Sequence, residues 1–244
     1  MILNPYTVLA ENYDYIIRHV DYHSWFEYIK TVMLEYCNNP GIIVELGTGT
    51  GKFGAKFSAA GYTIFGVDKS IDILRVAKRR AFGKFRLICA DMSAFYLKPK
   101  ADFVFSVHDT MNYFLTKKDI IKTLRCIASS MKEGSIFMFD ITTEHNILNN
   151  FHEKTTVHQT KELIIEWSNT YNKRKIVQSV LHFFKPDGTS QTEVHYQKIY
   201  ETEEISKLLH KCGFEILGIF GDHTFDAPNS ETIMINFVTR LKHK

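Results

Sequence analysis

Residues 42–51 read Ile-Ile-Val-Glu-Leu-Gly-Thr-Gly-Thr-Gly, and the rest of the chain is interpreted outward from this stretch. The β-branched run at its start predicts a short strand that is buried on both faces. Gly47, Gly49 and Gly51 then follow at every second position, and a helical segment begins near Lys52. Because glycine has no Cβ, such a loop can turn sharply and let a ligand lie against its backbone. The stretch therefore predicts a strand, a ligand-binding loop and a helix.

Two ligand classes fit this loop. The segment from Gly49 to Gly54, Gly-Thr-Gly-Lys-Phe-Gly, also matches the dinucleotide fingerprint GxGxxG. Glu45 separates the two interpretations because it stands two residues before the first glycine. A carboxylate there repels a pyrophosphate and attracts an ammonium or sulfonium group. Glu45 therefore favours a positively charged nucleoside.

An acidic residue followed by GxGxG resembles the first motif of the class I S-adenosylmethionine-dependent methyltransferases. The segments Tyr-x-x-Leu-Ala-x-x-Tyr-Asp (6–14) and Asp-Tyr-x-x-Trp (21–25) resemble the N-terminus of their bacterial small-molecule branch, which has an aromatic N-terminal lid and a β-insertion. The resemblance covers residues 1 to about 240. It implies that S-adenosyl-L-methionine is the cofactor, S-adenosyl-L-homocysteine the product, and in-line displacement the mechanism.

Composition sets limits on partners and compartment. A chain of 244 residues suffices for one domain, with room for a small inserted subdomain. The net charge of +3 is too small to indicate a nucleic-acid partner. The four cysteines show no CxxC spacing, which argues against a zinc site or a disulfide framework and suits a reducing compartment. No signal peptide or membrane-spanning apolar run is present. We expect a cytoplasmic protein that binds no metal, nucleic acid or membrane.

Strands and helices alternate from residue 42 to residue 141, which predicts an α/β fold with a doubly wound, mostly parallel sheet. The resemblance implies seven strands in a Rossmann-like methyltransferase fold, with the last strand inserted antiparallel; a dehydrogenase would continue with parallel units. Among the helix boundaries, Ser70 and Thr202 are expected as N-caps, and Gly134 as the residue that follows the helix containing Leu124. The expected strands after the first span 62–67, 85–89, 101–107, 135–141, 214–220 and 232–239.

The pattern changes in the second half of the chain. Alternating apolar residues around a Pro-Asp-Gly turn predict an antiparallel meander of about three strands in residues 151–200. Apolar residues at helical spacing predict helices in residues 1–40. The resemblance implies that this segment is a lid that closes over the cofactor, with packing of its aromatic side chains on the sheet as the alternative, and that residues 151–200 shape the acceptor pocket. Residues 41–150 and 201–244 are expected to form the cofactor-binding domain.

Asp68 ends the second predicted strand, at the spacing from the glycine loop where a carboxylate accepts both ribose hydroxyl protons. The resemblance implies that Asp91 accepts from the adenine amino group and that the backbone of Met92 donates to the ring. The complete predicted cofactor set is Tyr13, Trp25, Glu45, Gly47, Thr48, Gly49, Gly51, Asp68, Lys69, Asp91, Met92 and Val107.

His108 follows the fourth predicted strand and is the residue there whose pKa suits proton transfer near neutrality. It is the candidate catalytic base, with a neutral, hydrogen-bonded histidine as the alternative. The predicted acceptor-binding set is Tyr6, His108, Asn112, Tyr113 and His195. The expected reaction is methylation of an amine, hydroxyl or carboxylate of a small molecule or peptide. The alternatives are a methyltransferase acting on RNA or protein and a nicotinamide-dependent oxidoreductase.

Overall fold

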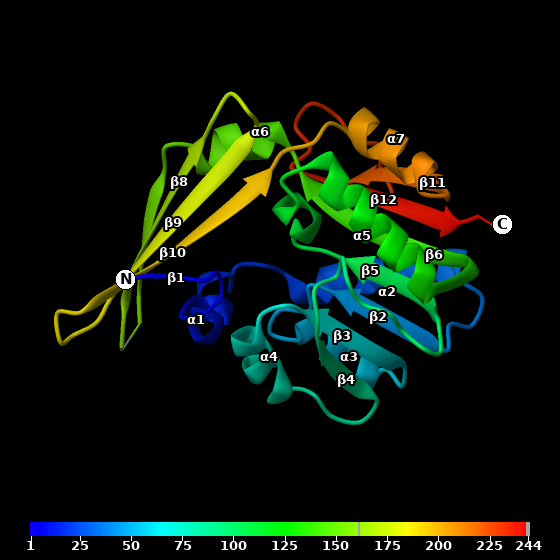
Figure 1. The fold of residues 1–244 in the computed structure, drawn as a ribbon, viewed down its shortest axis with the longest axis horizontal. Helices are drawn as coiled ribbons and strands as arrows, with labels where there is room; N and C mark the ends of the chain where they lie inside the picture. The colour runs from blue at the N-terminus through cyan, green and yellow to red at the C-terminus, as the bar shows by residue number, and fades with distance from the viewer. Residues whose placement is uncertain (161, 243–244) are drawn as a thin grey trace.

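The computed structural model describes residues 1–160 and 162–242, which form two β-sheets side by side (Figure 1). The larger sheet has the strand order β11-β12-β6-β5-β2-β3-β4. Its strands are β2 (Ile42–Leu46), β3 (Thr63–Asp68), β4 (Phe85–Cys89), β5 (Ala101–Ser106), β6 (Met131–Thr142), β11 (Phe214–Gly221) and β12 (Met234–Leu241). The predicted α/β fold with a mostly parallel seven-stranded sheet is confirmed.

The strand that carries the glycine loop lies inside this sheet. β2 pairs in parallel with β3 on one side and β5 on the other, and Ile43 and Val44 are buried, as the β-branched run predicts. β12 lies antiparallel between β6 and β11. The expected antiparallel last strand is therefore confirmed.

Helices cover both faces of the larger sheet. The helices are α1 (Leu9–Ile16), α2 (Tyr22–Tyr36), α3 (Lys52–Ala59), α4 (Ile71–Lys78), α5 (Lys117–Ser130) and α7 (Thr202–Lys211). α2 and α3 pack on one face, and α5 and α7, in front in Figure 1, pack on the other. On α2, Ile29, Val32 and Met33 have no exposed area, and each such burial stabilises the fold by about 1.5–3 kcal/mol. No helix within residues 1–160 and 162–242 is long and apolar enough to cross a membrane.

One of the predicted N-caps is correct and the other is wrong. Ser70 caps α4, because its Oγ accepts a hydrogen bond from the backbone amide of Ile73 at 3.3 Å. Thr202 is instead the first helical residue of α7, and Glu201 is the N-cap. Glu201 and Glu204 exchange hydrogen bonds in a capping box, which satisfies two backbone amides at the start of α7.

The predicted end of the helix before Gly134 is also wrong. α5 ends at Ser130, because Met131 takes an extended conformation and buries its side chain in the core. Gly134 lies within β6, where its φ of 78° marks a local irregularity of the strand rather than a helix terminus.

The smaller sheet extends the predicted meander. It has the order β1-β10-β9-β8-β7 and consists of β1 (Ile2–Leu3), β7 (Thr155–Gln159), β8 (Ile164–Tyr171), β9 (Ile176–Phe184) and β10 (Ser190–Lys198). The three expected strands are joined by β7 and by β1, which pairs in parallel with β10. We expected the N-terminal segment to be helical throughout. It begins instead with β1, an edge strand. Leu9 and Ile16 of α1 pack against Leu181 and Phe183 of this sheet.

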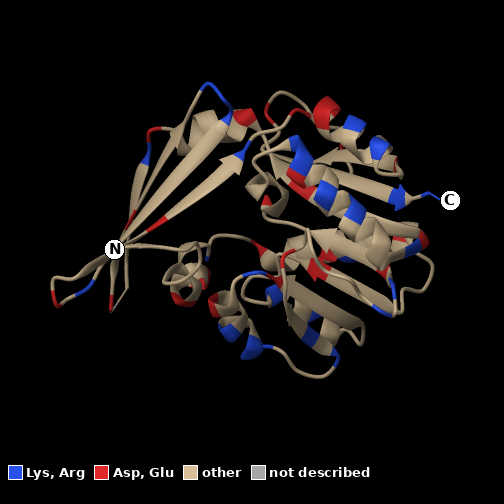
Figure 2. Ribbon diagram, viewed as in Figure 1, with Lys and Arg blue, Asp and Glu red and all other residues tan. Residues whose placement is uncertain are grey.

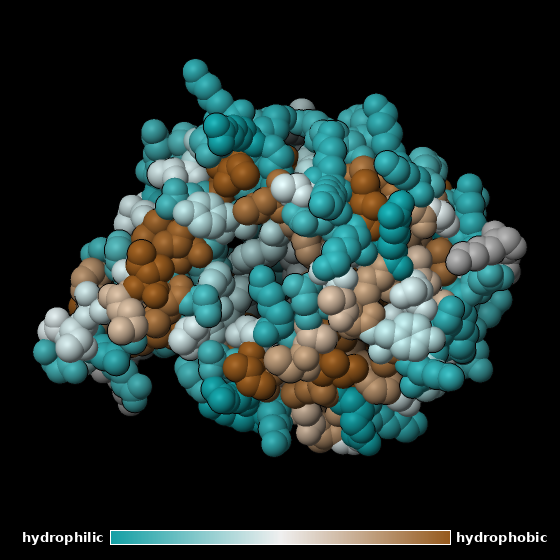
Figure 3. Space-filling view, in the orientation of Figure 1, coloured by the Kyte–Doolittle hydropathy of each residue, from teal (hydrophilic) through white to brown (hydrophobic). Residues whose placement is uncertain are grey.

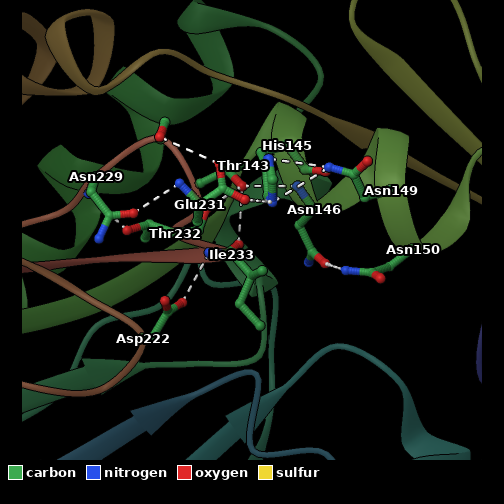
Figure 4. A network of polar contacts seen from close by, with 11 residues as sticks. Thr143, His145, Asn146, Asn149, Asn150, Asp222, Asn229, Glu231, Thr232 and Ile233 are labelled. Atoms are coloured by element: carbon green, nitrogen blue, oxygen red, sulfur yellow. Dashed lines mark hydrogen bonds and ion pairs between the residues drawn. The ribbon is translucent and has the colours of Figure 1, made fainter.

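A polar network fixes the point where the chain leaves β6 for the smaller sheet (Figure 4). The Thr143 hydroxyl donates to the carbonyl of Thr232 at 2.8 Å, and its amide donates to the carbonyl of Ile233 at 3.1 Å. The amide of Ile233 in turn donates to Asp222 at 2.9 Å. The exit from β6, through α6 (Glu144–Asn146) and η2 (Ile147–Phe151), is thus tied to the entrance of β12.

Candidate active site

A cavity of about 540 Å³ opens at the carboxyl ends of β2, β3, β4 and β5. Doubly wound sheets bind ligands at this edge, and the volume suits a small ligand. Figure 3 shows the surface hollowed between the smaller sheet and the helices of the larger one. The predicted site residues that line the cavity are Tyr6, Tyr13, Glu45, Gly47, Thr48, Gly49, Asp68, Lys69, Asp91, Met92, Val107, His108 and Tyr113.

The glycine loop forms one wall of the cavity. Gly47 and Gly49 have φ angles of 70° and 55°, in the left-handed region that residues with a Cβ rarely adopt. A Cβ on Gly47 would lie 2.5 Å from Cγ2 of Thr110, whereas a Cβ on Gly49 would meet nothing nearer than 3.8 Å. Gly47 therefore allows the loop after β5 to pack closely, and the backbone of Gly49 stays open to a ligand.

Glu45 lies at the base of this loop and is only 3% exposed. Its Oε2 accepts a hydrogen bond from the Thr48 hydroxyl at 2.7 Å. Burial raises the pKa of Glu45 to about 8, so the carboxyl is largely protonated at pH 7 unless a cation approaches it. The negative charge of Glu45, which favoured a cationic nucleoside in the sequence analysis, therefore depends on whether a cation is bound.

Two more carboxyl groups follow successive parallel strands. Asp68 accepts hydrogen bonds from the amides of Gly49 at 3.0 Å and Ser70 at 2.9 Å, and burial raises its pKa. Asp91 is exposed and accepts from the amide of Ser93 at 2.7 Å. Figure 2 shows acidic residues near the middle of the molecule, between α1 and the strands of the larger sheet. The glycine loop is thus bordered by carboxyl groups, while Lys52, Lys69 and Lys122 also line the cavity.

Comparisons with known proteins agree with this geometry. The profile of a family described as "Methyltransferase domain" matches residues 43–134. The Bacillus subtilis (strain 168) protein named "Putative methyltransferase YqeM" is 24% identical over 95% of both chains. A solved S-adenosylmethionine-dependent methyltransferase from Clostridium acetobutylicum ATCC 824 is 25% identical, with a TM-score of 0.84 over 98% of this chain and 99% of that one. The chain is a class I S-adenosylmethionine-dependent methyltransferase.

A further solved structure extends the likeness at the level of the fold. The sugar N-methyltransferase KedS8 from Streptoalloteichus sp ATCC 53650 is 17% identical to this methyltransferase. Its TM-score is 0.78, and the match covers 95% of this chain and 93% of that chain. The coverage shows that the smaller sheet, and not the larger one alone, belongs to the shared architecture.

In this methyltransferase, α1 is fastened to the glycine loop by Asp14. The carboxylate accepts a hydrogen bond from the Thr50 hydroxyl at 2.7 Å and lies 3.3 Å from the Lys52 ammonium. Arg80 also pairs with it, at 2.5 Å. These contacts hold the preceding residue of the same helix, Tyr13, against the cavity. The N-terminal helix is thus part of the cavity wall.

His108 lies at the inner end of the cavity in an unusual backbone conformation. His108 and Asp109 both have positive φ, 60° and 49°, which turns their amides toward the buried carboxylate of Asp140 at 3.0 and 2.7 Å. The imidazole packs against Trp25, with ring centroids 4.4 Å apart. Among the described residues, its Nε2 is buried without a hydrogen-bond partner. Burial lowers the pKa of His108 to about 4, so the ring is neutral at pH 7.

The remaining predicted site residues, Trp25, Gly51, Asn112 and His195, do not line the cavity. The amide side chain of Asn112 is used at both ends, because it donates to the carbonyl of Lys198 at 2.7 Å and accepts from the amide of Thr142 at 3.1 Å. Gly51 is the N-cap of α3, where a Cβ would press on the Phe85 ring at 3.1 Å. Trp25 stands behind His108, and His195 stands behind Tyr113. These residues support the wall rather than form it.

Sequence reasoning missed part of the lining. The missed residues are Tyr22, Thr50, Lys52, Phe53, Ile73, Ala90, Ser93, Thr110, Phe114, Leu115, Thr116, Asp119 and Lys122. Thr50 lies within the glycine loop, and Lys52 and Phe53 begin α3. Ligands commonly meet the amides of a helix start, so that position was a usable signal. The start of α5, around Asp119, carries no such signal, because only the packing of that helix brings it to the cavity.

Proposed function

We propose that this methyltransferase transfers the methyl group of S-adenosylmethionine to a nitrogen or oxygen of a small molecule or peptide. The observation that carries the proposal is the position of Glu45, Asp68 and Asp91 around an open glycine loop, in a cavity that tyrosines also line. A cationic nucleoside fits beside the carboxyl groups, and a small acceptor fits among the tyrosines. The proposal extends the family assignment to particular residues of this chain.

Three carboxyl groups have separate roles in this proposal. Asp68 accepts from the ribose hydroxyls, at the end of β3. Asp91 accepts from the adenine amino group, and the amide of Met92 donates to the ring. Glu45 faces the positively charged end of the cofactor, whose charge favours the ionised form of a carboxyl group that burial otherwise keeps protonated. Thr48, Lys69 and Val107 complete the wall.

The acceptor end is enclosed by residues from three parts of the chain. Tyr6 precedes α1, Tyr22 begins α2, and Tyr113 ends η1 (Thr110–Tyr113). We propose that residues 1–40 act as the lid over this end and that residues 151–200 complete it through the smaller sheet. Contacts of Asp14 with the glycine loop support the lid assignment, because they couple α1 to the cofactor side of the cavity.

S-adenosylmethionine supplies a methyl group that is activated by its bond to a positively charged sulfur. The chain holds the acceptor in line with that bond and excludes water, and alignment of this kind can lower a barrier by about 7–11 kcal/mol. His108 contributes a neutral imidazole to the cavity wall, and among the described residues its buried Nε2 has no hydrogen-bond partner. A group with a pKa of about 4 is a weak base, so we assign His108 to positioning rather than to holding the proton.

An amine is the acceptor class that we favour for the first tests. The neighbour KedS8 carries the name sugar N-methyltransferase and shares both sheets with this chain. Four tyrosines line the cavity, Tyr6, Tyr13, Tyr22 and Tyr113, and aromatic faces can hold a cationic amine.

Two measurements test the proposal. Thermal unfolding with S-adenosylhomocysteine should raise the midpoint, and the same concentration of NAD should leave it unchanged, because a ligand stabilises only the state that binds it. Transfer of labelled methyl groups into a panel of amines, alcohols and carboxylates then identifies the acceptor. Stabilisation by NAD and not by S-adenosylhomocysteine would refute the cofactor assignment.

A further inference from the structure

Four side chains from distant parts of the chain form an unbroken hydrogen-bonded series that starts at the cavity. The hydroxyls of Tyr6 and Tyr113 lie 2.7 Å apart, and Tyr113 lies 3.0 Å from Nδ1 of His195. Nε2 of His195 lies 3.2 Å from Oε2 of Glu193. Tyr6 and Tyr113 line the cavity, whereas His195 and Glu193, on β10, are 4% and 0% exposed.

The direction of each hydrogen bond follows from the buried end. Burial alone would raise the pKa of Glu193, but hydrogen bonds from His195 and from the amides of Tyr6, Val8 and Leu9 hold it below its usual value. An ionised carboxylate can only accept, so Nε2 of His195 carries the proton toward Glu193, and in the neutral form of the ring Nδ1 is then the free lone pair. Tyr113 therefore donates to Nδ1.

The same reasoning reaches the cavity. The hydroxyl proton of Tyr113 is used toward His195, so its oxygen accepts the proton of Tyr6. The oxygen of Tyr6 then keeps its lone pairs for a partner in the cavity. Each group in the series accepts from the cavity side and donates toward Glu193, which is the polarity that a proton needs to move inward.

We propose that Tyr6, Tyr113 and His195, with Glu193 behind them, form a proton relay that deprotonates an alkylammonium acceptor before methyl transfer. This inference rests on the proposed function. The N–H bond of the ammonium breaks, and its proton joins the Tyr6 oxygen. The proton of Tyr6 passes to the Tyr113 oxygen, and that of Tyr113 passes to Nδ1 of His195. The acceptor nitrogen keeps the electron pair of the broken bond, and the imidazolium is paired with the Glu193 carboxylate.

The relay assigns the acceptor class by its chemistry. A carboxylate acceptor has no proton to give. A hydroxyl has a pKa near that of water, ~15.7, which is roughly nine units above the pKa of an ordinary imidazole. Burial and neighbouring charges shift a pKa by up to about 3–5 units, which is too little to close this gap. An alkylammonium that resembles that of lysine has a pKa of ~10.4, which is about four units above the pKa of an imidazole. Of these three classes, the ammonium alone both needs the relay and is within its reach.

Other titratable groups face the relay from each neighbouring element. Asp109 follows β5, Asp68 ends β3 and Tyr13 lies on α1, and all three act on Tyr6 or Tyr113 through their charge or ring. Burial raises the pKa of Asp109 to about 7 and also that of Asp68. Asp109 thus titrates near neutrality itself, and the test below must separate its effect from that of the relay.

The first test needs no acceptor. In protein labelled with ¹⁵N-histidine, the imidazole resonances of His195 should show a protonated Nε2 and an unprotonated Nδ1. Tyr113→Phe, which removes the donor and keeps the ring, should shift the Nδ1 resonance. A proton on Nδ1, or a Nδ1 resonance that Tyr113→Phe leaves in place, would overturn the relay.

The second test measures transfer of labelled methyl groups to D-glucosamine, with N-acetyl-D-glucosamine as the matched compound that has no ammonium. Tyr6→Phe should lower the rate on the amine below the pKa of its ammonium, by up to ~10-fold for each pH unit below that pKa, and the loss should shrink as pH approaches the pKa of the amine, where the acceptor arrives neutral. Rescue at high pH is a relay effect, because Asp109 is unchanged in the variant. A full rate at pH 7, or an equal loss at every pH, would refute it.

Two controls keep failure of the relay distinct from failure of the proposed function. His182→Gln alters another histidine of the same sheet, which bonds to Thr192 at 2.9 Å on the opposite face, and should leave rate and pH profile unchanged. The shift in unfolding midpoint with S-adenosylhomocysteine should be the same for wild type and Tyr6→Phe. Absence of that shift in the wild type would count against the proposed function, whereas its presence with the wrong His195 tautomer would count against the relay alone.

Discussion

Binding of a cationic cofactor should release a proton from Glu45. In the free protein the Glu45 carboxyl is buried, and its pKa is raised to about 8. A positive charge placed next to it favours the ionised form and lowers that pKa. The experiment therefore varies the pH at which the cofactor binds. The control variant is Glu45→Gln, which removes the titrating proton and keeps the size of the side chain and the hydrogen bond with Thr48.

The pKa of Glu45 sets the magnitude. With a pKa of about 8, roughly nine in ten molecules carry the proton at pH 7. If the bound cofactor restores the ordinary value, close to one proton leaves per cofactor bound. Affinity should then rise by up to ~10-fold per pH unit between pH ~5 and ~8 and level off above. Without cofactor the sign is the reverse: the folded state binds the extra proton, so stability falls as pH rises through the same window.

Calorimetry in two buffers of different ionisation enthalpy counts the protons released. The wild type should release about one proton near pH 7, and Glu45→Gln should release much less and show a flat affinity between pH 5 and 8. The same proton release in both proteins would assign the linkage to another group, such as Asp109, whose pKa is also raised by burial. No release and no pH dependence in the wild type would refute the reasoning that Glu45 faces the cationic end of the cofactor.

Three further predictions follow from the same geometry. Asp68→Ala should weaken binding of S-adenosylhomocysteine by removing two charged hydrogen bonds, each worth about 1.5–3 kcal/mol; calorimetry with unchanged affinity would contradict the ribose assignment. Gly47→Ala should abolish binding because its Cβ would lie 2.5 Å from Thr110, and Thr110→Ala in the same chain should restore part of it; a fully active Gly47→Ala would show that the loop tolerates the shift. Asp140→Ala should lower the free energy of unfolding in urea by about 3–5 kcal/mol, since it leaves three buried donors unpaired; a loss under 1 kcal/mol would mean that water replaces them.

The reliable sequence predictions are those that depend on neighbouring residues. In this chain the glycines at every second position after a β-branched run mark a strand and an open loop, and Ser70 caps its own helix. The wrong predictions at Thr202 and Gly134 have the same physical cause. In both cases the predicted residue type was suitable, but a competing interaction, the Glu201–Glu204 capping box or the burial of Met131, fixed the boundary one to four residues away.

The acceptor end shows where local reasoning stops. Asn112 and Tyr113 are adjacent in sequence and equally polar, yet one binds backbone groups of β6 and β10 and the other lines the cavity. Nothing in their neighbours distinguishes them, because the difference depends on how η1 is oriented against β10.

The sequence by itself determined the ligand edge: a glycine loop, with carboxyl groups at the ends of successive parallel strands, has to meet at one side of the sheet. The tertiary structure decided which side chains meet there. Tyr6 and His195 come together because β1 joins the smaller sheet beside β10, and Glu193 binds the amides of Tyr6, before α1, and of Leu9, at its start. Hydrogen bonds of this kind depend on sub-ångström placement of segments far apart in the chain, and that placement is set by the packing of the two sheets.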